Sequence, residues 1–394
     1  MNGPHLKKQI ILKKNEERRI ISGHPWVFSN EVHETKGDPS IGDVVELLAA
    51  TGLSIGMGLY NPHSLITFRL LSRTIEEVDH DFFHRTISRA HSLRNKLYPD
   101  SHTYRVIHGE GDFLPGLIVD KYNDYLSVQT YSYGMDARLQ LICDVLESMF
   151  RPVGIVERNE SQLRTLEHLP QRKAVLRGTV SPTVITEHGL QYTVDVLEGQ
   201  KTGFFLDQRE SRAAVRQFSH AASVLDCFCN DGGFSLNSAY AGASSVHGVD
   251  ISAESIRRAA ANAELNDLDA ARFEQGDVFE KLKKLHSEGA RFDLIVLDPP
   301  SFTKNKKDVQ AAKIAYKRLH AGTIRLLKSG GILVTASCSH HIDPSVFLDI
   351  IDKATRELGR TLQLLDWRGA APDHPILPAV PETRYLKLGI FCVH

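Results

Sequence analysis

The chain has 394 residues, which predicts roughly two to three domains at about 150 residues each. Hydrophobic residues make up 42% of the chain and charged residues 24%, so the composition excludes disordered and fibrous proteins. The formal net charge of −1 excludes a protein coated in positive charge, so any contact with a polyanion must come from a local basic patch.

No run approaches the ~18 apolar residues that cross a bilayer, which predicts no membrane association. The N-terminal sequence MNGPHLKKQIILKK lacks the apolar core of a secretory signal peptide, so a cytoplasmic protein is expected. The five cysteines include no CxxC pair. They are expected to be reduced thiols, with neither a disulfide framework nor a metal site.

The sequence of the first half of the chain predicts two domains, neither of which shows the strand–helix alternation of a parallel sheet. Residues 1–75 contain short β-branched and aromatic runs separated by turns such as Gly37–Asp38 and Asn61–Pro62, which predicts a small β-barrel. Residues 76–189 combine a helical pattern over 76–97, strands such as GLIVDKY and a second helix around 139–150, which is typical of an α+β domain. A hairpin-like segment, LQYTVDVLEGQKTGFFLDQR, follows Gly189.

Residues 190–394 predict a doubly wound α/β domain. Apolar strands SVLDCF, SVHGVD, ARFEQG, FDLIVLD and GILVTAS alternate with helices that begin near residues 233, 253, 278, 308 and 344. This alternation predicts a parallel, Rossmann-like sheet with helices on both faces.

Acidic residues close four successive strands of that sheet, at the edge where open α/β sheets bind ligands. Asp250 ends the second strand, at the distance from Asp226 at which an acid can accept hydrogen bonds from both hydroxyls of an adenosine ribose. The first turn lacks the GxGxxG run that brings backbone against a pyrophosphate, so a ligand without phosphates is favoured. Asp277 could then accept from an adenine amine, while Asp298 would lie beside the reacting centre. Each acid could instead simply cap a helix.

Several motifs together resemble one enzyme family. GQKTGFFLDQR, DCFCNDGGFS, HGVD, DPPSF and SCS, with the N-terminal HPWVFSNEV, make the chain similar to the rRNA large subunit methyltransferase I family of 5-methylcytosine enzymes. The resemblance implies a PUA RNA-binding domain, a central α+β domain and a class I methyltransferase domain that binds S-adenosylmethionine. It also implies large-subunit rRNA as the partner, with a homodimer as one assembly seen in the family. The chain departs from the family where Cys229–Asn230–Asp231 replaces the more frequent Ser–Tyr–Thr.

The strand-end positions and this resemblance give one expected cofactor site. Its members lie before the first strand, in the turns after the first two strands and at the ends of the next two: Gln208, Asp226, Cys227, Phe228, Asn230, Gly232, Asp250, Ile251, Asp277, Val278 and Asp298.

Methylation of carbon 5 of a pyrimidine needs a nucleophile that adds at carbon 6, and a thiolate is suited to it. Cys338 follows the apolar strand GILVTAS at the ligand edge, and the family nucleophile falls in this SCS motif. A small buried hydrophobe is the alternative role for a cysteine. Many related enzymes carry a second cysteine after the fourth strand, where this chain has Pro299–Pro300–Ser301, so the proton-accepting base is left unassigned. Asp298 is expected to hydrogen-bond the cytosine.

A basic run begins directly after the DPPSF motif. Residues 301–328 contain eight basic side chains and one acid, a local balance of +7. Lys304, Lys306 and Lys307 are expected to bind RNA phosphates, and Phe302 to stack an extruded base. An ordinary solvated face is the alternative. His374, beside Asp373, is a further candidate base or RNA contact, with a neutral surface histidine as the alternative.

Three other functions remain open at this point. A guanine or adenine nitrogen methyltransferase would use the DPP loop and need no thiol. A non-catalytic RNA-binding or ribosome-assembly protein would need neither, but the acids and Cys338 count against it. A dehydrogenase is disfavoured by the missing GxGxxG run.

Overall fold

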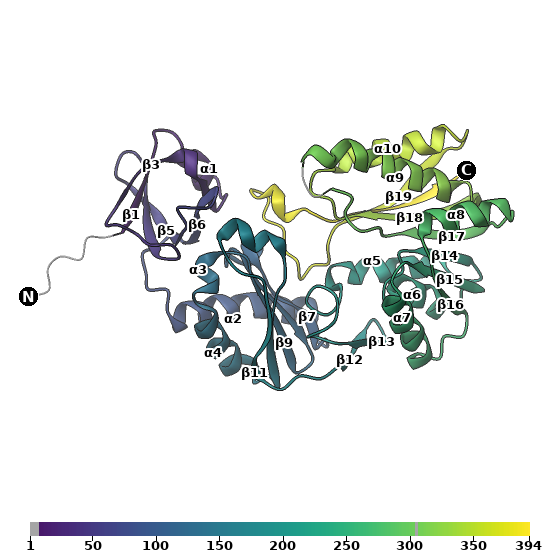
Figure 1. Ribbon diagram of the computed structural model, residues 1–394, viewed down its shortest axis with the longest axis horizontal. Helices are drawn as coiled ribbons and strands as arrows, with labels where there is room; N and C mark the ends of the chain where they lie inside the picture. Colours follow the sequence, from purple (N-terminus) through teal and green to yellow (C-terminus); the bar gives the residue numbers. More distant parts are fainter. Residues whose placement is uncertain (1–7, 304–305) are drawn as a thin grey trace, which may run out of the picture. The chain divides into compact units, whose positions relative to one another are not determined.

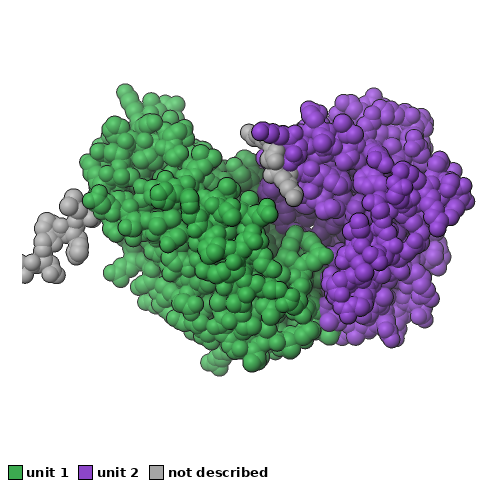
Figure 2. Space-filling model, in the orientation of Figure 1, with its two compact units in different colours: residues 1–185, 194–206, 372–383 green, residues 186–193, 207–371, 384–394 purple. Residues whose placement is uncertain are grey.

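The structure is a computed structural model that describes residues 8–303 and 306–394. The chain forms two compact units, coloured separately in Figure 2. Unit 1 comprises residues up to 185 with 194–206 and 372–383; unit 2 comprises 186–193, 207–371 and 384–394. The segment 372–383 thus joins unit 1 although unit 2 both precedes and follows it. The division into consecutive domains 1–75, 76–189 and 190–394 remains a prediction.

The N-terminal part of unit 1 is a small β domain, as the turn-rich sequence predicts. Its described strands form one sheet in the order β2-β6-β5-β4-β1-β3, in which β1 runs parallel to β4 and the other neighbouring strands are antiparallel. Alternate residues of β4 are buried, so one face of that strand supplies the core. The elements are β1 (Gln9–Leu12), α1 (Glu17–Ile21), β2 (Trp26–Phe28), β3 (Val32–Lys36), β4 (Val44–Leu48), β5 (Ser54–Tyr60) and β6 (Ile66–Ser72).

The remainder of unit 1 is a mixed sheet with helices packed on it. The sheet has the order β11-β10-β9-β8-β7, and α2 and α4 share one apolar core with it (Figure 1). Both helices lie where the sequence predicted them. The elements are α2 (His80–Leu97), β7 (Thr103–His108), β8 (Leu117–Tyr122), β9 (Tyr125–Thr130), α3 (Tyr133–Asp136), α4 (Leu139–Phe150), β10 (Gly154–Asn159) and β11 (Arg172–Gly178).

The hairpin near Gly189 begins earlier than the sequence suggested. β13 (Leu190–Val194) pairs back onto β12 (Thr183–Glu187) instead of pairing with the residues that follow it. His188 and Gly189 both have positive φ, at 48° and 83°, as the central residues of a type I′ turn require. The turn is therefore at His188–Gly189, and residues 195–205 continue as turns with one isolated bridge between Gln200 and Gly203.

Unit 2 contains the predicted Rossmann-like sheet. Its strand order is β16-β15-β14-β17-β18-β20-β19, parallel through β18 and antiparallel at β20. The central strands are buried on both faces: all of Leu294–Leu297 is 0% exposed, as a parallel sheet covered by two helical layers requires. The strands are β14 (Ser223–Cys227), β15 (Ser245–Asp250), β16 (Ala271–Gln275), β17 (Phe292–Leu297), β18 (Leu327–Ser337), β19 (Leu362–Arg368) and β20 (Lys387–Val393).

Two helical groups cover this sheet. α8, α9 and α10 contribute to a single core with β14, β17 and β18, while α5 and α7 both pack against α6 (Figure 1). No helix in the described ranges is long and apolar enough to cross a membrane. The helices are α5 (Arg209–Ala214), α6 (Gly233–Tyr240), α7 (Ala253–Leu265), α8 (Val278–Ser287), α9 (Val309–Ile324) and α10 (Pro344–Arg356).

Candidate active site

The strand order of unit 2 reverses direction at β14, since β15 lies on one side of it and β17 on the other. At such a switch point the two following loops separate and leave a crevice at the carboxyl edge. The loops after β14, β15, β17 and β18 meet this edge because these strands are parallel neighbours. The predicted cofactor and catalytic residues lie in or beside these loops.

The loop after β14 has an unusual backbone. Phe228, Asn230 and Gly232 all have positive φ, at 64°, 47° and 83°. Hydrogen bonds from the Phe228 and Cys229 amides to Val249 O hold the loop against β15. A Cβ at Gly232 would lie 2.7 Å from Leu236, so glycine is required there. Non-glycine residues in this region cost about 1–3 kcal/mol each, and such strain concentrates at binding sites.

Asp226 lies inside the sheet behind that loop. It is 0% exposed, and its Oδ2 accepts bonds from the backbone N and Oγ of Ser235 at 3.0 and 2.7 Å. Its Oδ1 has no partner among the described residues. Burial raises the pKa of Asp226 to about 7. Asp226 therefore ties β14 to the first turn of α6 and fixes where the loop between them runs.

Asp250 ends β15 at the carboxyl edge of the sheet. Its two carboxylate oxygens accept the backbone amides of Asn230 at 3.1 Å and Ser252 at 2.9 Å. A carboxylate oxygen can accept a second hydrogen bond, so both oxygens keep capacity for a ligand's hydroxyl groups. The next side chain, Ile251, is 67% exposed and offers an apolar surface beside them. Two hydrogen-bond acceptors beside an apolar surface suit the ribose and base of an adenosine.

Asp277 and Val278 begin α8. Asp277 Oδ1 accepts the amide of Glu280 at 3.0 Å, so this acid caps the helix, which is the alternative role that the sequence left open. Val278 is 3% exposed and packs in the core. A cap still has a second oxygen, so Asp277 remains a predicted adenine contact.

Asp298 and Gln208 lie together beside the end of β17. Gln208 Nε2 donates to Asp298 Oδ2 at 3.1 Å. Gln208 is 4% exposed, and its Oε1 is buried without a partner in the described part of the chain. A buried unpaired acceptor costs free energy unless a ligand supplies a donor, so this atom indicates a binding site.

The cysteines differ sharply in accessibility. Cys143, Cys227 and Cys229 are buried, and burial raises the pKa of each thiol, to about 11 at Cys143. Cys392 lies near the far end of β20, opposite Ile332 at the start of the buried part of β18. Only Cys338 is both partly exposed and at the carboxyl edge of the sheet.

A chain of hydroxyl groups joins the loop after β17 to the loop after β18. Ser301 Oγ lies 3.0 Å from Ser339 Oγ, which lies 3.1 Å from the Tyr316 hydroxyl, and that hydroxyl lies 2.9 Å from Ser337 Oγ. Behind Tyr316, the fully buried His320 contacts Tyr316 O and Thr335 Oγ1 at 2.6 and 2.9 Å. This network holds Cys338 in position from both sides.

A buried lysine completes the surroundings of Cys338. Lys387 is 4% exposed, and its Nζ donates to Ser339 O at 2.8 Å. Burial lowers the pKa of Lys387, while negative charge at Cys338 and Asp343 acts in the opposite direction. Sequence reasoning missed Lys387, Tyr316 and His320 because they lie far from the SCS motif in sequence. Strand pairing brings Lys387 to the motif, and the packing of α9 on β18 brings Tyr316 and His320 to it.

The predicted RNA contacts are only partly described. Lys304 lies outside the described residues, and Lys306 and Lys307 begin a short 3₁₀ segment in which Lys307 is exposed. Phe302 packs edge-on against Tyr316, with ring centroids 4.8 Å apart. The basic residues of 301–328 do not all lie at the carboxyl edge of the sheet. Lys328 pairs with Asp293 at the opposite edge, near the amino ends of β18 and β17.

The segment with Asp373 and His374 belongs to unit 1. Asp373 Oδ2 accepts the amide of Arg105 at 2.8 Å, and its Oδ1 lies 2.8 Å from His374 Nδ1. His374 is 3% exposed, so the expectation of a surface histidine is wrong. The buried carboxylate instead anchors this segment in unit 1.

Comparisons with known proteins match the fold of both parts of the chain. Residues 10–73 match a PUA-like domain, and residues 161–387 match the family of S-adenosylmethionine-dependent methyltransferases. A Streptococcus mutans protein assigned as a SAM-dependent methyltransferase has the same fold, with a TM-score of 0.84 at 21% identity over 98% of this chain and 99% of that one. A similar structure, TM-score 0.85 at 21% identity with the same coverage, was solved with SAH bound.

Two curated relatives are similar over nearly their whole length. Both are named ribosomal RNA large subunit methyltransferase I: one from Shewanella denitrificans is 38% identical over 96% of this chain and 98% of its own, and one from Vibrio cholerae is 38% identical over 97% and 98%. The chain therefore belongs to the S-adenosylmethionine-dependent methyltransferases, in the family of ribosomal RNA large subunit methyltransferase I.

Proposed function

We propose that this enzyme transfers a methyl group from S-adenosylmethionine to carbon 5 of a cytosine in large-subunit rRNA, with Cys338 as the nucleophile. The observation that carries the proposal is the position of Cys338. It is the accessible thiol at the carboxyl end of β18, next to the strand that ends at Asp298. A nitrogen methyltransferase needs no thiol there.

S-adenosylmethionine supplies the electrophilic methyl group, and the loops after β14 and β15 provide its binding residues. Asp250 would hold the two ribose hydroxyls, and the exposed Ile251 would supply an apolar surface for the adenine. Asp277 would accept a hydrogen bond from the adenine amine, whereas the Val278 side chain is in the core and leaves only its backbone to contact the adenine. The turn formed by Cys227, Phe228, Asn230 and Gly232 would hold the ligand, and the buried Asp226 fixes the course of that turn. The buried Oε1 of Gln208, which has no partner among the described residues, would accept a hydrogen bond from the cofactor beside Asp298.

The Cys338 thiolate adds to carbon 6 of the cytosine, and the electron pair of the 5,6 double bond makes carbon 5 nucleophilic. Carbon 5 takes the methyl group, which releases S-adenosylhomocysteine, and then gives its proton to a general base that the sequence leaves unassigned. The electron pair of that carbon–hydrogen bond re-forms the 5,6 double bond and expels the Cys338 thiolate. With a proton on its carboxyl group, Asp298 would donate a hydrogen bond to the ring nitrogen of the cytosine and so stabilise the negative charge that thiolate addition places on the ring. An ammonium at Lys387 and a thiolate at Cys338 stabilise each other through their opposite charges.

Several features support RNA as the substrate. The PUA-like domain and the names of the relatives both point to it. Lys304, Lys306 and Lys307 follow the DPPSF loop and are proposed to bind phosphates, while Phe302 is proposed to contact the extruded base.

The thiol can be tested by Cys338→Ala, with Cys392→Ala as a matched control in the same protein. We expect Cys338→Ala to abolish methylation of rRNA while folding and S-adenosylmethionine binding stay nearly unchanged, because one sulfur atom is removed. RNA that contains 5-fluorocytosine should form a covalent adduct with the wild type and the control, and none with Cys338→Ala.

Mass spectrometry of the methylated nucleoside reads the base directly. 5-Methylcytosine supports the proposal. Methylated guanine or adenine, or full activity of Cys338→Ala, would overturn it in favour of nitrogen methylation at the Asp298–Pro299–Pro300 loop. If the protein bound RNA but methylated no rRNA, the remaining function would be that of a non-catalytic ribosome-assembly protein.

A further inference from the structure

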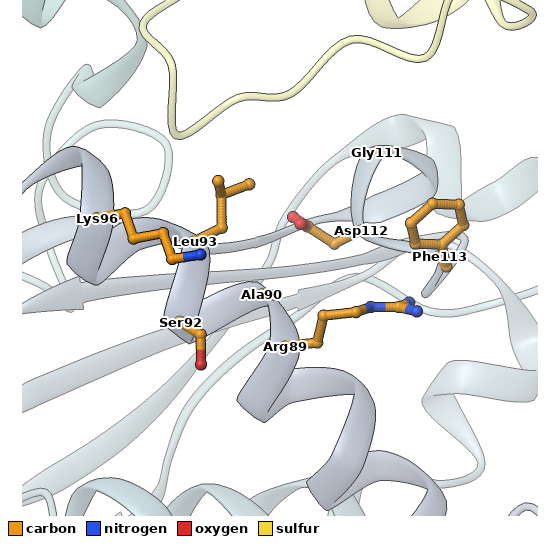
Figure 3. Close-up of a pocket in the computed structure, with 8 residues that line it drawn as sticks. All are labelled: Arg89, Ala90, Ser92, Leu93, Lys96, Gly111, Asp112 and Phe113. Atoms are coloured by element: carbon orange, nitrogen blue, oxygen red, sulfur yellow. The ribbon is translucent and has the colours of Figure 1, made fainter.

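A separate pocket lies in unit 1, between α2 and the short 3₁₀ segment Gly109–Asp112 that follows β7 (Figure 3). Its volume is about 490 Å³, which is in the range of pockets that hold one small ligand. None of the predicted cofactor, catalytic or RNA-binding residues lines it.

The floor of the pocket is rigid and electrically neutral. Arg94, which is 0% exposed, donates to both oxygens of Asp112 at 2.5 and 2.6 Å, and also to Asp373 O at 2.6 Å. A Cβ at Gly111 would lie 2.4 Å from Pro375 O, so the segment 372–383 presses directly on this loop. Arg94 therefore neutralises the charge of Asp112 from the protein interior, and the residues at the floor of the pocket are held in place before a ligand binds.

One wall carries an exposed aromatic ring in a strained backbone. Phe113 is 49% exposed and has a φ of 64°, a conformation that suits glycine. The Arg89 guanidinium lies 4.7 Å from the centroid of its ring. Figure 3 shows the two side chains next to each other at one end of the pocket. The strain and the exposure both oppose a purely structural role for this phenyl ring.

The rim carries unbalanced positive charge. Arg89 and Lys96 lie seven residues apart on α2 and so share a face of the helix, and both are exposed. Within the described part of the chain, neither forms an ion pair with a carboxylate, and Asp112 is already neutralised by Arg94. A ligand with a flat apolar group and a negative group matches this combination.

We propose that this pocket binds one unpaired nucleotide of the RNA substrate, with its base stacked on Phe113 and its phosphates held by Arg89 and Lys96. The proposal rests on RNA being the substrate. Single-stranded RNA combines aromatic bases with a phosphate chain, and proteins bind it through stacking platforms beside cations. A nucleotide held here is bound by unit 1 and is distinct from the one that reacts at Cys338.

The informative variant is Phe113→Gly in the full-length protein. Glycine accepts the positive φ, so the melting temperature should stay equal or rise while the stacking surface is removed. We expect the affinity for a short fluorescent oligouridine to fall by about tenfold, the usual effect of losing one stacked base. Leu166→Ala, which removes a side chain that is 66% exposed in the same unit, should leave that affinity unchanged.

A second variant tests the charges. Replacing Arg89 and Lys96 together by alanine should flatten the salt dependence of oligouridine binding by about one unit of slope for each phosphate that is no longer bound. The matched control replaces Lys353 and Arg356 of α10, two surface cations in unit 2. Ultraviolet cross-linking of the same RNA should label the peptide that contains Phe113 in the wild type.

Wild-type affinity and salt dependence in both pocket variants, or cross-links confined to other peptides, would overturn the pocket proposal. The proposed methylation would survive that result, since 5-methylcytosine is measured separately. Conversely, an enzyme that forms no 5-methylcytosine but loses oligouridine affinity in Phe113→Gly would refute the proposed reaction and keep the pocket.

Discussion

The loops after β14 and β18 leave the same edge of the same sheet but are built differently. The first is shaped by its backbone: positive φ at Phe228, Asn230 and Gly232, with the buried Asp226 behind it. The second is shaped by side chains: the hydroxyls of Ser339 and Tyr316 and the ammonium of Lys387 hold the residues around Cys338.

The difference between the two loops suits two functions, cofactor binding and the positioning of a reactive side chain. A backbone fixed by strain and by a buried acid gives a ligand a constant surface, which suits a cofactor used in every turnover. Neutral hydroxyl bonds contribute about 1 kcal/mol each, so several are needed to hold one reactive side chain. Variants at each loop should therefore change different measurements, binding at the first and turnover at the second.

The largest effect is expected at Asp250, which accepts a hydrogen bond from Asn230 of the first loop. Asp250→Ala should weaken S-adenosylmethionine binding by about 3 kcal/mol, since two charge-assisted hydrogen bonds are removed. Isothermal titration calorimetry measures this directly. Asp352→Ala on α10, a surface acid paired with Arg356, is the control and should bind normally. Wild-type affinity of a folded Asp250→Ala protein would reduce this acid to a structural role.

The next effect concerns His320, behind the second loop. Burial lowers the pKa of His320 to about 4, so its contribution to stability is present above pH 6.5 and is lost as the pH falls towards 4. The free energy of unfolding relative to His320→Gln should therefore drop by about 2 kcal/mol between pH 7 and pH 5. Urea unfolding at both pH values tests this. A constant difference would mean that the imidazole is not buried in the neutral form.

Asp226, behind the first loop, should show the opposite sign. Because the pKa of Asp226 is raised to about 7, its stabilising contribution is present below pH 3.8 and is lost as the pH rises through 7. Relative to Asp226→Asn, which keeps the bonds to Ser235, the wild type should lose about 2 kcal/mol between pH 5 and pH 7. The same urea experiments measure this loss. If the free energy of unfolding of the wild type instead rose relative to Asp226→Asn as the pH increased, the raised pKa of Asp226 would be contradicted.

The smallest effect is expected from Tyr316→Phe. Removing this hydroxyl leaves Ser337 and Ser339 with one partner fewer, which should cost about 1 kcal/mol of stability. We expect kcat to fall several-fold with little change in the KM for S-adenosylmethionine, because only the Cys338 loop is loosened. Tyr240→Phe, at a tyrosine that is 52% exposed, should change neither. An unchanged kcat would remove Tyr316 from the positioning of Cys338.

Hydrophobic periodicity predicted the unit 2 helices well. α6, α7, α8 and α10 begin at Gly233, Ala253, Val278 and Pro344, where the sequence placed them. Apolar runs bounded by acids and glycines are local features of the sequence, so they can be recognised without knowledge of the fold. The same signals located Asp250, Asp298 and Cys338 at strand ends, and parallel strands then carry them to one edge.

Long-range contacts had no such signal. The bond from Lys387 to Ser339 spans 48 residues, and the bond from Arg94 to the carbonyl of Asp373 spans 279. The sequence therefore determined the order of elements and the acids and thiol at their ends, because periodicity and turn chemistry are local. Only the tertiary structure decided which buried cations and hydroxyls surround Cys338, and that Asp373 and His374 are anchored in unit 1, because strand pairing and burial bring together residues that no spacing connects.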